Sequence, residues 1–446
     1  MLGESRIKNL IETTLALSPA NDTEVSLSAM EEGVTRFANN AIIQNVAETD
    51  ADLQVRVIFG RRSGMASTND FSRESLNRVV KAACEIAQHQ PENPDDIRLP
   101  DPTPIPKVDS FDERVESASP ELRAKAVGDI CKIARDAAVI AAGAYSTSAM
   151  ESAIANSRGL WAYHPSTSVD LTMVATKENG TGYSHGTSWR LDRVQAASLG
   201  QEAITRAIKS RAPRHLDPAE YVVILEPYAV VDILENLATF GMGALSFQEG
   251  RSWMNGRIGK LTLSPKISIW DDGLDLDGEP QPFDCEGMPK QRVDIVRDGV
   301  PSELVYDIHT ASHEGRHSTG HAQPYDDDWD GPMPSNLNIG AGDSSVEEMI
   351  ASTRRGLYIT RFWYTNMLSE HNCVLTGMTR DGTFLIERGE IVEPIRNLRF
   401  TQSLVKALKN VSAVGREARP IGGYYGSHRV PHLKIDGFRF TGISGQ

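Results

Sequence analysis

The sequence predicts an α+β fold of two domains, because of its length, its periodicity and one break in composition. The chain has 446 residues, which is more than a single hydrophobic core usually spans. Helical and strand-like periodicities alternate in the first half, whereas strand-like segments dominate the second. A segment with two prolines at 212–218 separates the halves. We therefore expect an N-terminal α/β domain with antiparallel meanders and helices at 1–214, and a C-terminal, mostly antiparallel β domain at 215–446.

The chain is expected to begin with a helix and an antiparallel meander. Residues 4–17 carry apolar side chains at helical spacing and predict a helix. Polar and apolar residues alternate at 23–28 and 53–59, which is typical of half-buried strands. Asn39 and Asn40 lie between two short apolar stretches and predict a tight turn of a hairpin.

The rest of the first half predicts more helices and strands around one irregular segment. Asp70 or Ser72 is placed to cap a helix whose apolar stripe begins at Leu76. Residues 91–106 hold six prolines and predict an extended loop. A helix is expected at 119–142. Further strands are expected at 147–150 and 168–174, and a last helix is expected at 194–210.

The second half begins with a buried strand at 221–225 and a helix that starts at Pro227. Strands then dominate to the end of the chain. They are expected at 267–270, 293–296, 384–387 and 433–436, with short helices near 346–353 and 401–410.

Composition excludes several functional classes. The net charge of −14 disfavours binding to nucleic acid or to an anionic membrane, which both attract basic surfaces. The four cysteines are widely separated and form no CxxC pair, so a reducing cytoplasm is expected. The amphipathic, charged N-terminus does not predict a signal peptide, and no run of 18 apolar residues predicts a membrane span.

One histidine cluster attracts attention as a candidate metal site. His309, His313, His317 and His321 recur at intervals of four, which would place them on one face of a helix. Residues 313–317 are HEGRH and fit the pattern H-E-x-x-H. On a helix, that pattern binds Zn²⁺ through two histidines and offers the glutamate, here Glu314, as general base.

The residues around the cluster argue against a helical zinc site. No large apolar side chain lies between His309 and His321, so a helix there would have no buried back face. Gly315 and Gly320 would each destabilise it by about 1 kcal/mol relative to alanine, and residues 318–320 are typical of a loop. Two alternatives stay open: an exposed or cleft-lining loop, or a loop that binds a metal or a substrate carboxylate through one or two histidines.

A set of short motifs together resembles one known family. They are TRFANN at 35–40, NSRG at 156–159, SWMNGRIGK at 252–260, FDCEGMP at 283–289, RDGV at 297–300, STGHA at 318–322, GEI at 389–391 and LKIDG at 433–437. Each motif is weak alone, but the combination resembles the TldD/PmbA peptidase family, whose older label is modulator of DNA gyrase. The resemblance covers nearly the whole chain.

The resemblance implies a branch without its own catalytic metal. TldD-type chains carry H-E-x-x-x-H on the helix that here spans 228–249, and a metal-binding cysteine near the C-terminus. Aligned on GRIGK, those positions fall at about Glu235, Asn236 and Phe240, and the segment 422–436 has no cysteine. The STGHA segment is similar to that of the PmbA/TldE branch, so the chain resembles a member of that branch.

The resemblance also implies a partner and a substrate. A PmbA/TldE-like chain is expected to pair with a TldD-type subunit, or with itself as a homodimer, and to help enclose an unfolded peptide. Zinc is expected in the TldD-type partner and no cofactor in this chain. The candidate substrate-binding residues are Ser318, Thr319, Gly320 and His321. An exposed strand edge would bind the peptide backbone by β-augmentation.

Two alternatives to this hypothesis remain. The chain could be a self-sufficient zinc metallopeptidase in which His313, Glu314 and His317 act with His309 or His321. It could instead be a non-enzymatic protein that modulates another factor, such as a topoisomerase. No confident catalytic residue is assigned under the subunit hypothesis.

Other chemically capable residues have plainer interpretations. Acids near the second-domain helix could face a cavity or solvent. Two acids in the FDCEGMP turn could be paired carboxylates, although acids in a turn more often cap backbone amides. An acidic run could bind a hard cation or be solvated. A thiol–imidazole pair and an aromatic set could serve a site or the core. These residues are Glu226, Glu235, Glu249, Asp284, Glu286, Asp326–Asp328, Asp330, His371, Cys373, Tyr358 and Phe362–Tyr364.

Overall fold

The protein has the α+β fold that the sequence predicts, with two sheets that follow each other along the chain. The computed structural model describes residues 1–94, 98–324 and 331–443, so the acidic run at 326–330 lies outside the described residues. A six-stranded sheet uses residues 22–188, and an eleven-stranded sheet uses residues 220–443. The segment 212–218 lies between them.

The first sheet is fully antiparallel, with strand order β3-β2-β1-β4-β5-β6. Its strands are β1 (Asp22–Ala38), β2 (Ala41–Phe59), β3 (Arg62–Thr68), β4 (Ile140–Asn156), β5 (Trp161–Lys177) and β6 (Gly180–Ser188). Its helices are α1 (Glu4–Leu17), α2 (Arg73–His89), α3 (Glu113–Glu116), α4 (Pro120–Asp136), the 3₁₀ turn η1 (Leu191–Arg193) and α5 (Ala196–Lys209).

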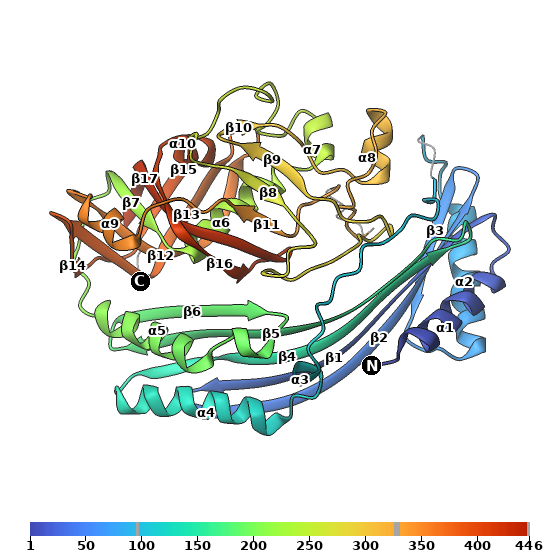
Figure 1. Cartoon of the computed structure of the whole chain (residues 1–446), viewed down its shortest axis with the longest axis horizontal. Helices are drawn as coiled ribbons and strands as arrows, with labels where there is room; N and C mark the ends of the chain where they lie inside the picture. The colour runs from blue at the N-terminus through green and yellow to red at the C-terminus, as the bar shows by residue number, and fades with distance from the viewer. Residues whose placement is uncertain (95–97, 325–330, 444–446) are drawn as a thin grey trace.

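The helices cover one face of this sheet, and the C-terminal half lies over the other (Figure 1). Strand alternation explains the difference between the faces, since successive side chains point to opposite sides. Val25, Leu27 and Ala29 of β1 are buried beneath α1 and α2. The residues between them in the sequence, such as Ser26 and Ser28, therefore belong to the helix-free face.

Local signals in the first half are confirmed where they concern turns and caps. Asn39 and Asn40 have φ values of 51° and 60°, as the predicted hairpin turn requires. Ser72 caps α2, since its hydroxyl accepts a hydrogen bond from the Ser75 amide at 3.3 Å. The helix predicted at 119–142 is wrong at its end. The helix stops at Asp136, and the alanine-rich continuation forms β4, because strand pairing with β1 and β5 outweighs helix propensity.

The second sheet contains a closed ring of strands. Strand β17 pairs with both β15 and β7, so that β17, β15, β13, β12 and β7 follow each other around a barrel. Its strands are β7 (Glu220–Leu225), β8 (Ile269–Asp271), β9 (Val293–Arg297), β10 (Val300–Pro301), β11 (Leu337–Ile339), β12 (Arg355–Ser369), β13 (Val374–Glu387), β14 (Glu390–Pro394), β15 (Leu398–Ser403), β16 (Val411–Gly422) and β17 (Ser427–Ile443).

Short helices complete the C-terminal half. They are α6 (Pro227–Thr239), α7 (Ala244–Gln248), α8 (Ile308–His313), α9 (Val346–Ala351) and α10 (Leu404–Lys409). The helix assigned to 228–249 is thus two helices, α6 and α7, and the one expected at 401–410 begins three residues later, because 401–403 belong to β15. Among the described residues, no helix is both long and apolar enough to cross a bilayer.

A buried ionic contact joins the two halves. The Arg206 guanidinium on α5 forms an ion pair with the Glu226 carboxylate at the start of α6, and Glu226 is 2% exposed. Arg206 also donates to the Tyr183 carbonyl at 2.8 Å and to Glu202 at 2.5 Å. The contact holds α6 in a defined position relative to the first sheet.

Candidate functional site

The helix α6 is apolar on most of its surface, and a single polar stripe interrupts that surface. Its buried residues include Val230, Val231, Ile233, Leu234 and Leu237, which pack in the core of the barrel. The partly exposed positions are Asp232, Glu235, Asn236 and Thr239. They follow an i, i+3, i+4, i+7 pattern, so they lie on one face of the helix.

A groove of about 530 Å³ lies along this stripe. Asp232 and Glu235 contribute its acidic floor. Its walls come from three distant parts of the chain: β6, β12 and the segment after β16. The aromatic and cationic residues that line it are Tyr183, Tyr228, Arg361, Trp363, Tyr364 and Tyr424. Tyr364 and Tyr424 are 71% and 87% exposed, so an apolar rim is open to a ligand or partner.

Glu235 is held by three donors from the C-terminal segment. Its Oε1 atom accepts hydrogen bonds from the backbone amides of Tyr424 and Tyr425, at 2.6 and 3.3 Å. It also faces Nε2 of His428 at 3.0 Å. The Leu337 amide donates to Nδ1 of His428 at 3.2 Å, so Nδ1 is an acceptor and Nε2 carries the proton that goes to Glu235. Both ring nitrogens of His428 are therefore in use.

The residues of this stripe do not fit the metal that the resemblance implies for TldD-type chains. The Asn236 side-chain amide donates a hydrogen bond to the Asp232 backbone carbonyl at 2.8 Å, and the Phe240 side chain has no atom that could bind a metal. Glu235 is already engaged, whereas a zinc site needs several nitrogen, sulfur or carboxylate ligands around one point. Within residues 1–94, 98–324 and 331–443, no group of three or more His, Cys, Asp or Glu side chains is arranged to hold a metal ion.

Two charged groups give the groove its electrostatic character. Burial, and then the neighbouring Glu235 carboxylate, raise the pKa of Asp232 to about 7, although Arg361 opposes the shift. The Arg361 side chain donates to Asp381 at 2.6 Å. Its guanidinium lies 4.1 Å from the Tyr183 ring centre and 4.8 Å from that of Trp363. This stacking ties the first sheet to β12 at the edge of the groove.

The histidine cluster does not form a helical zinc motif. The helix α8 ends at His313, and Gly315 has a φ of 63°, so His313 and His317 do not share a helical face. Glu314 is occupied elsewhere, since it accepts from the Gln248 amide at 3.0 Å and from the Tyr306 hydroxyl at 2.9 Å. The rings of His309 and His313 lie 4.6 Å apart, edge to face.

The candidate substrate-binding segment is built into the interior. His321 is 0% exposed; its Nε2 faces Asp271 at 2.8 Å, and its Nδ1 faces the Thr319 hydroxyl at 2.9 Å. Gly320 has a φ of 76° and lies against the backbone of residue 289, where a Cβ would meet Pro289 O at 2.3 Å. Ser318 is also buried. Peptide contact by this segment stays a prediction, and it would require the segment to move.

The other candidates separate into structural and groove-lining residues. Asp284 caps its turn as predicted, because its Oδ1 accepts from the Glu286 and Met288 amides at 3.0 and 2.9 Å. Glu286 accepts from the Ile308 amide at 2.9 Å. Glu249 pairs with Arg251 on the surface. Cys373 is fully buried, and loss of hydration raises the pKa of its thiol to about 12.

The aromatic set at 358–364 is divided between core and groove. Phe362 is 2% exposed and stacks on Phe438 in the barrel core, although it also borders the groove, whereas Trp363 and Tyr364 are exposed along the groove. Sequence inspection missed Asp232, His428 and Arg361 as site residues. Asp232 could have been found, since it is the first member of a polar stripe in an otherwise apolar helix. His428 and Arg361 carry no local signal, because only long-range strand pairing brings them to α6.

Comparison with known proteins agrees with this architecture. Family models described as PmbA/TldA metallopeptidase domain 1, central domain and C-terminal domain match residues 23–87, 99–211 and 218–442. The chain is 24% identical over 447 residues to Metalloprotease PmbA of Escherichia coli O157:H7, covering 95% of this chain and 94% of that one. It is 25% identical over 392 residues to the Metalloprotease TldD homolog of Haemophilus influenzae, covering 82% and 79%.

A solved structure has the same fold. The crystal structure of TldE from Thermococcus kodakarensis matches with a TM-score of 0.86 at 19% identity, over 98% of this chain and 99% of that one. At this sequence identity, the similarity shows only that the two folds are alike. The match to the C-terminal family model spans more than half of the sequence, and the two further models cover most of the remainder. On these grounds the chain belongs to the PmbA/TldA metallopeptidase family, also called TldD/PmbA.

Proposed function

We propose that this chain is a PmbA/TldE-like, non-catalytic subunit of a cytoplasmic peptidase that acts on unfolded peptides, and that a TldD-type partner supplies the metal. One observation carries the proposal. Glu235 and Asn236 on α6, and Phe240 just after it, occupy the positions where TldD-type chains are expected to bind metal, and Oε1 of Glu235 is already bound by His428 and two backbone amides.

The groove is better suited to binding than to hydrolysis. Its rim carries exposed aromatic side chains, Trp363, Tyr364 and Tyr424, which provide contact area for a peptide or a partner chain. Its acidic floor lacks a metal ligand set within the described part of the chain. We therefore assign the groove to substrate or partner contact and assign no step of hydrolysis to it.

A free strand edge supports the proposed mode of peptide binding. Strand β3 pairs with β2 only from Leu53 to Phe59. On the part of the chain that the structure describes, the preceding stretch of β2, residues 41–52, is paired only with β1. An extended peptide could add to this edge through main-chain hydrogen bonds, which give affinity without sequence selection.

The test compares this chain, a TldD-type partner and their mixture on one unfolded peptide, with metal content measured for each protein. We expect the mixture to cleave, and this chain alone to show background turnover without stoichiometric metal. A TldD-type variant that lacks its metal-binding histidines is the matched control and should leave the mixture inactive. Chelator-sensitive turnover by this chain alone would refute the subunit proposal.

A further inference from the structure

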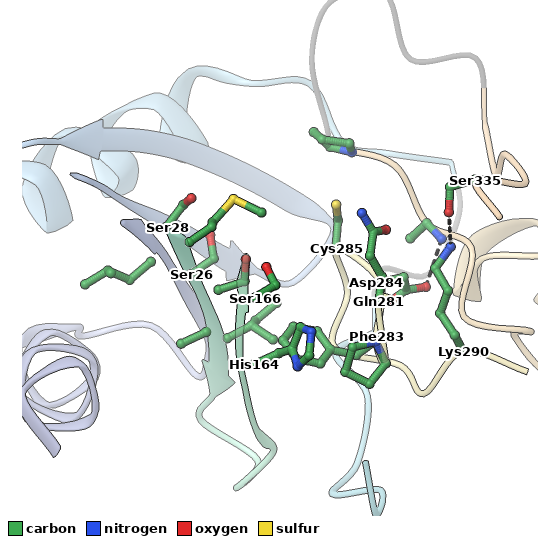
Figure 2. Close-up of a pocket in the computed structure, with 18 of the residues that line it drawn as sticks. Ser26, Ser28, His164, Ser166, Gln281, Phe283, Asp284, Cys285, Lys290 and Ser335 are labelled. Carbon is green, nitrogen blue, oxygen red and sulfur yellow. Dashed lines mark hydrogen bonds between the residues drawn. The ribbon is translucent and has the colours of Figure 1, made fainter. Parts of the chain in front are cut away.

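A second cavity, of about 680 Å³, is lined by other residues than the α6 groove, although Tyr425, whose amide binds Glu235, borders it. The cavity lies between two walls. One is the helix-free face of the first sheet, and the other is formed by residues 279–285 and 322–324 of the second half. In Figure 2, Ser26, Ser28 and Ser166 project from the strands toward Cys285 and Gln281 on the opposite wall. The two walls come from different halves of the protein, so the cavity exists only in the assembled fold.

The sheet wall is a row of hydroxyl groups. Strand register places Ser28 opposite Ser152, and Ser152 opposite His164. Period-two alternation puts Ser26 and Ser166 on the same face. None of the four serine side chains hydrogen-bonds to another described residue, whereas His164 faces the Ser110 hydroxyl at 3.0 Å. The hydroxyl groups are therefore available to a ligand.

The cavity carries more negative than positive groups. Of the described residues that line it, Glu24, Asp52, Glu279 and Asp284 are acidic and one, Lys290, is a lysine. Lys290 is buried beside Asp284 and donates to the Ser335 hydroxyl at 2.5 Å. Its charge is thus directed to the wall rather than to the open volume.

Among the residues that the structure describes, Glu24 in this wall accepts no hydrogen bond, and its contact with a cation is a long ion pair with Arg56. It is 7% exposed, and the contact of its Oε1 with Nη1 of Arg56 measures 3.9 Å, which is too long for a hydrogen bond. Burial raises the pKa of Glu24 to about 7, against the attraction of Arg56 and with the repulsion of Asp284. A buried carboxylate that loses its hydration without gaining hydrogen bonds lowers the stability of the folded state. Such acids cluster at ligand sites.

We propose that this cavity binds a small organic cation, in which a primary ammonium group is carried on a short chain. Glu24 serves as the counter-ion and accepts one of the three ammonium protons, and the hydroxyl oxygen of Ser26, two residues along the same strand face, accepts a second. Ser28 and its cross-strand partner Ser152 lie about 13 Å further along the strands, at about 3.3 Å per residue. Their hydroxyl groups are therefore placed for the other end of the ligand. The apolar wall residues Met65 and Phe283 contact the carbon chain. The proposed contacts use neither the α6 groove nor the β2 edge, although Asp52, the last residue of that edge, lines the cavity. The proposal therefore does not rest on the subunit role.

An organic ligand fits better than a metal ion. The described residues hold no set of three or more His, Cys, Asp or Glu side chains suited to a metal. Asp284 has its oxygens occupied by the amides of Glu286, Met288 and Ala322. Such an ammonium group could belong to a free amine or to the N-terminus of a peptide, and the two sources can be told apart.

The first experiment is calorimetric titration of the purified chain with putrescine, and with 1,4-butanediol as its uncharged counterpart. We expect putrescine to bind and the diol to bind at least tenfold more weakly. Glu24→Gln should weaken putrescine binding at least tenfold, whereas Glu48→Gln, an exposed acid on β2 outside the cavity, should leave it unchanged. Equal binding of the diol, or no effect of Glu24→Gln, would overturn the proposal.

The source of the ammonium is tested with a tripeptide and its N-acetylated form. Tighter binding of the free tripeptide than of putrescine would identify a peptide N-terminus, and the reverse order would identify a free amine. If neither the tripeptide nor putrescine binds, the proposal is wrong.

The second experiment uses the cavity's own thiol. Cys285 has exposed surface, whereas Cys84, Cys131 and Cys373 are buried. Partial loss of hydration, and then the Asp284 carboxylate, raise the pKa of the Cys285 thiol to about 12, so its labelling is slow and is followed with excess reagent. Saturating putrescine should slow modification of Cys285 by N-ethylmaleimide severalfold, and the diol should not. Ser28→Phe, which fills the cavity from the sheet side, should abolish the protection. Unchanged labelling with putrescine would count against the site, even if Glu24→Gln fails to fold.

Discussion

Glu235 and His428 meet through a 3.0 Å contact between Oε1 and Nε2, although 193 residues separate them in the sequence. The Leu337 amide fixes the imidazole tautomer from the other side. The carboxylate also fastens the backbone of residues 424 and 425. At the position where a metal-binding relative would need free ligands, this chain thus has a hydrogen-bond network that occupies Oε1 of Glu235.

Glu235→Ala is expected to destabilise the protein. The His428 side chain is 1% exposed, so its Nε2–H would lose its acceptor in a buried place, which costs about 1–3 kcal/mol. Glu235→Gln keeps an acceptor oxygen and should lose less. Urea unfolding of the three proteins measures the difference. Equal stability of the alanine variant and the wild type would show that the network does not contribute to folding.

Glu24→Gln is expected to stabilise the ligand-free protein at alkaline pH. The folded pKa of Glu24 is raised from 4.5 to about 7, so the folded state binds this proton more tightly than the unfolded state. The stabilisation of the folded state by protonated Glu24 is fully present below pH 4.5 and is lost as the pH rises through 7. Since one pKa unit corresponds to about 1.4 kcal/mol, the ionised group costs on the order of 3 kcal/mol at pH 8.

Unfolding free energies of wild type and Glu24→Gln, measured at pH 4.5 and pH 8, check this prediction. The variant should be more stable at pH 8, and the two proteins should be alike at pH 4.5. Glu48→Gln, at an exposed position, should show no such pH dependence. A difference between wild type and Glu24→Gln that stays constant with pH would contradict the raised pKa.

Arg206→Ala is expected to weaken the contact between the two halves. It would leave Glu226 buried without its ion-pair partner, and breaking such a pair typically costs about 3–5 kcal/mol. The double variant Arg206→Ala with Glu226→Gln removes the orphaned charge and should recover part of the loss. Chemical denaturation of all four members of this cycle gives the coupling energy. Strict additivity would mean that the two charges are not coupled.

The histidine cluster is expected to be dispensable for peptidase activity. The double variant His313→Ala with His317→Ala should support the same turnover with a TldD-type partner, because the two residues do not share a helical face. Glu314→Ala should instead lower the melting temperature, since Gln248 and Tyr306 would lose their acceptor. Loss of turnover in the double histidine variant, with an unchanged melting temperature, would restore the zinc-site alternative.

The sequence by itself determined the local features of this protein. The Asn39–Asn40 turn, the Ser72 cap, the buried strand at 221–225 and the capping role of Asp284 all follow from interactions between residues close in sequence. The motifs also indicated the family, because each is a short run of neighbouring residues that can be recognised in the sequence without knowledge of the fold. The end of α4 was predicted wrongly, since the residues after it have helix propensity but pair as a strand.

Only the tertiary structure determined which residues line the two cavities. Pairing of β17 with β7 closes the barrel and brings His428 to Glu235. Packing of the second half over the first sheet places residues 279–285 opposite Ser26 and Ser28. Periodicity reports which face of an element is buried, but it carries no information about which distant segment covers the other face. The hydrogen-bonding partners of Glu235, and the burial of Glu24 without one among the described residues, are therefore properties of the folded chain alone.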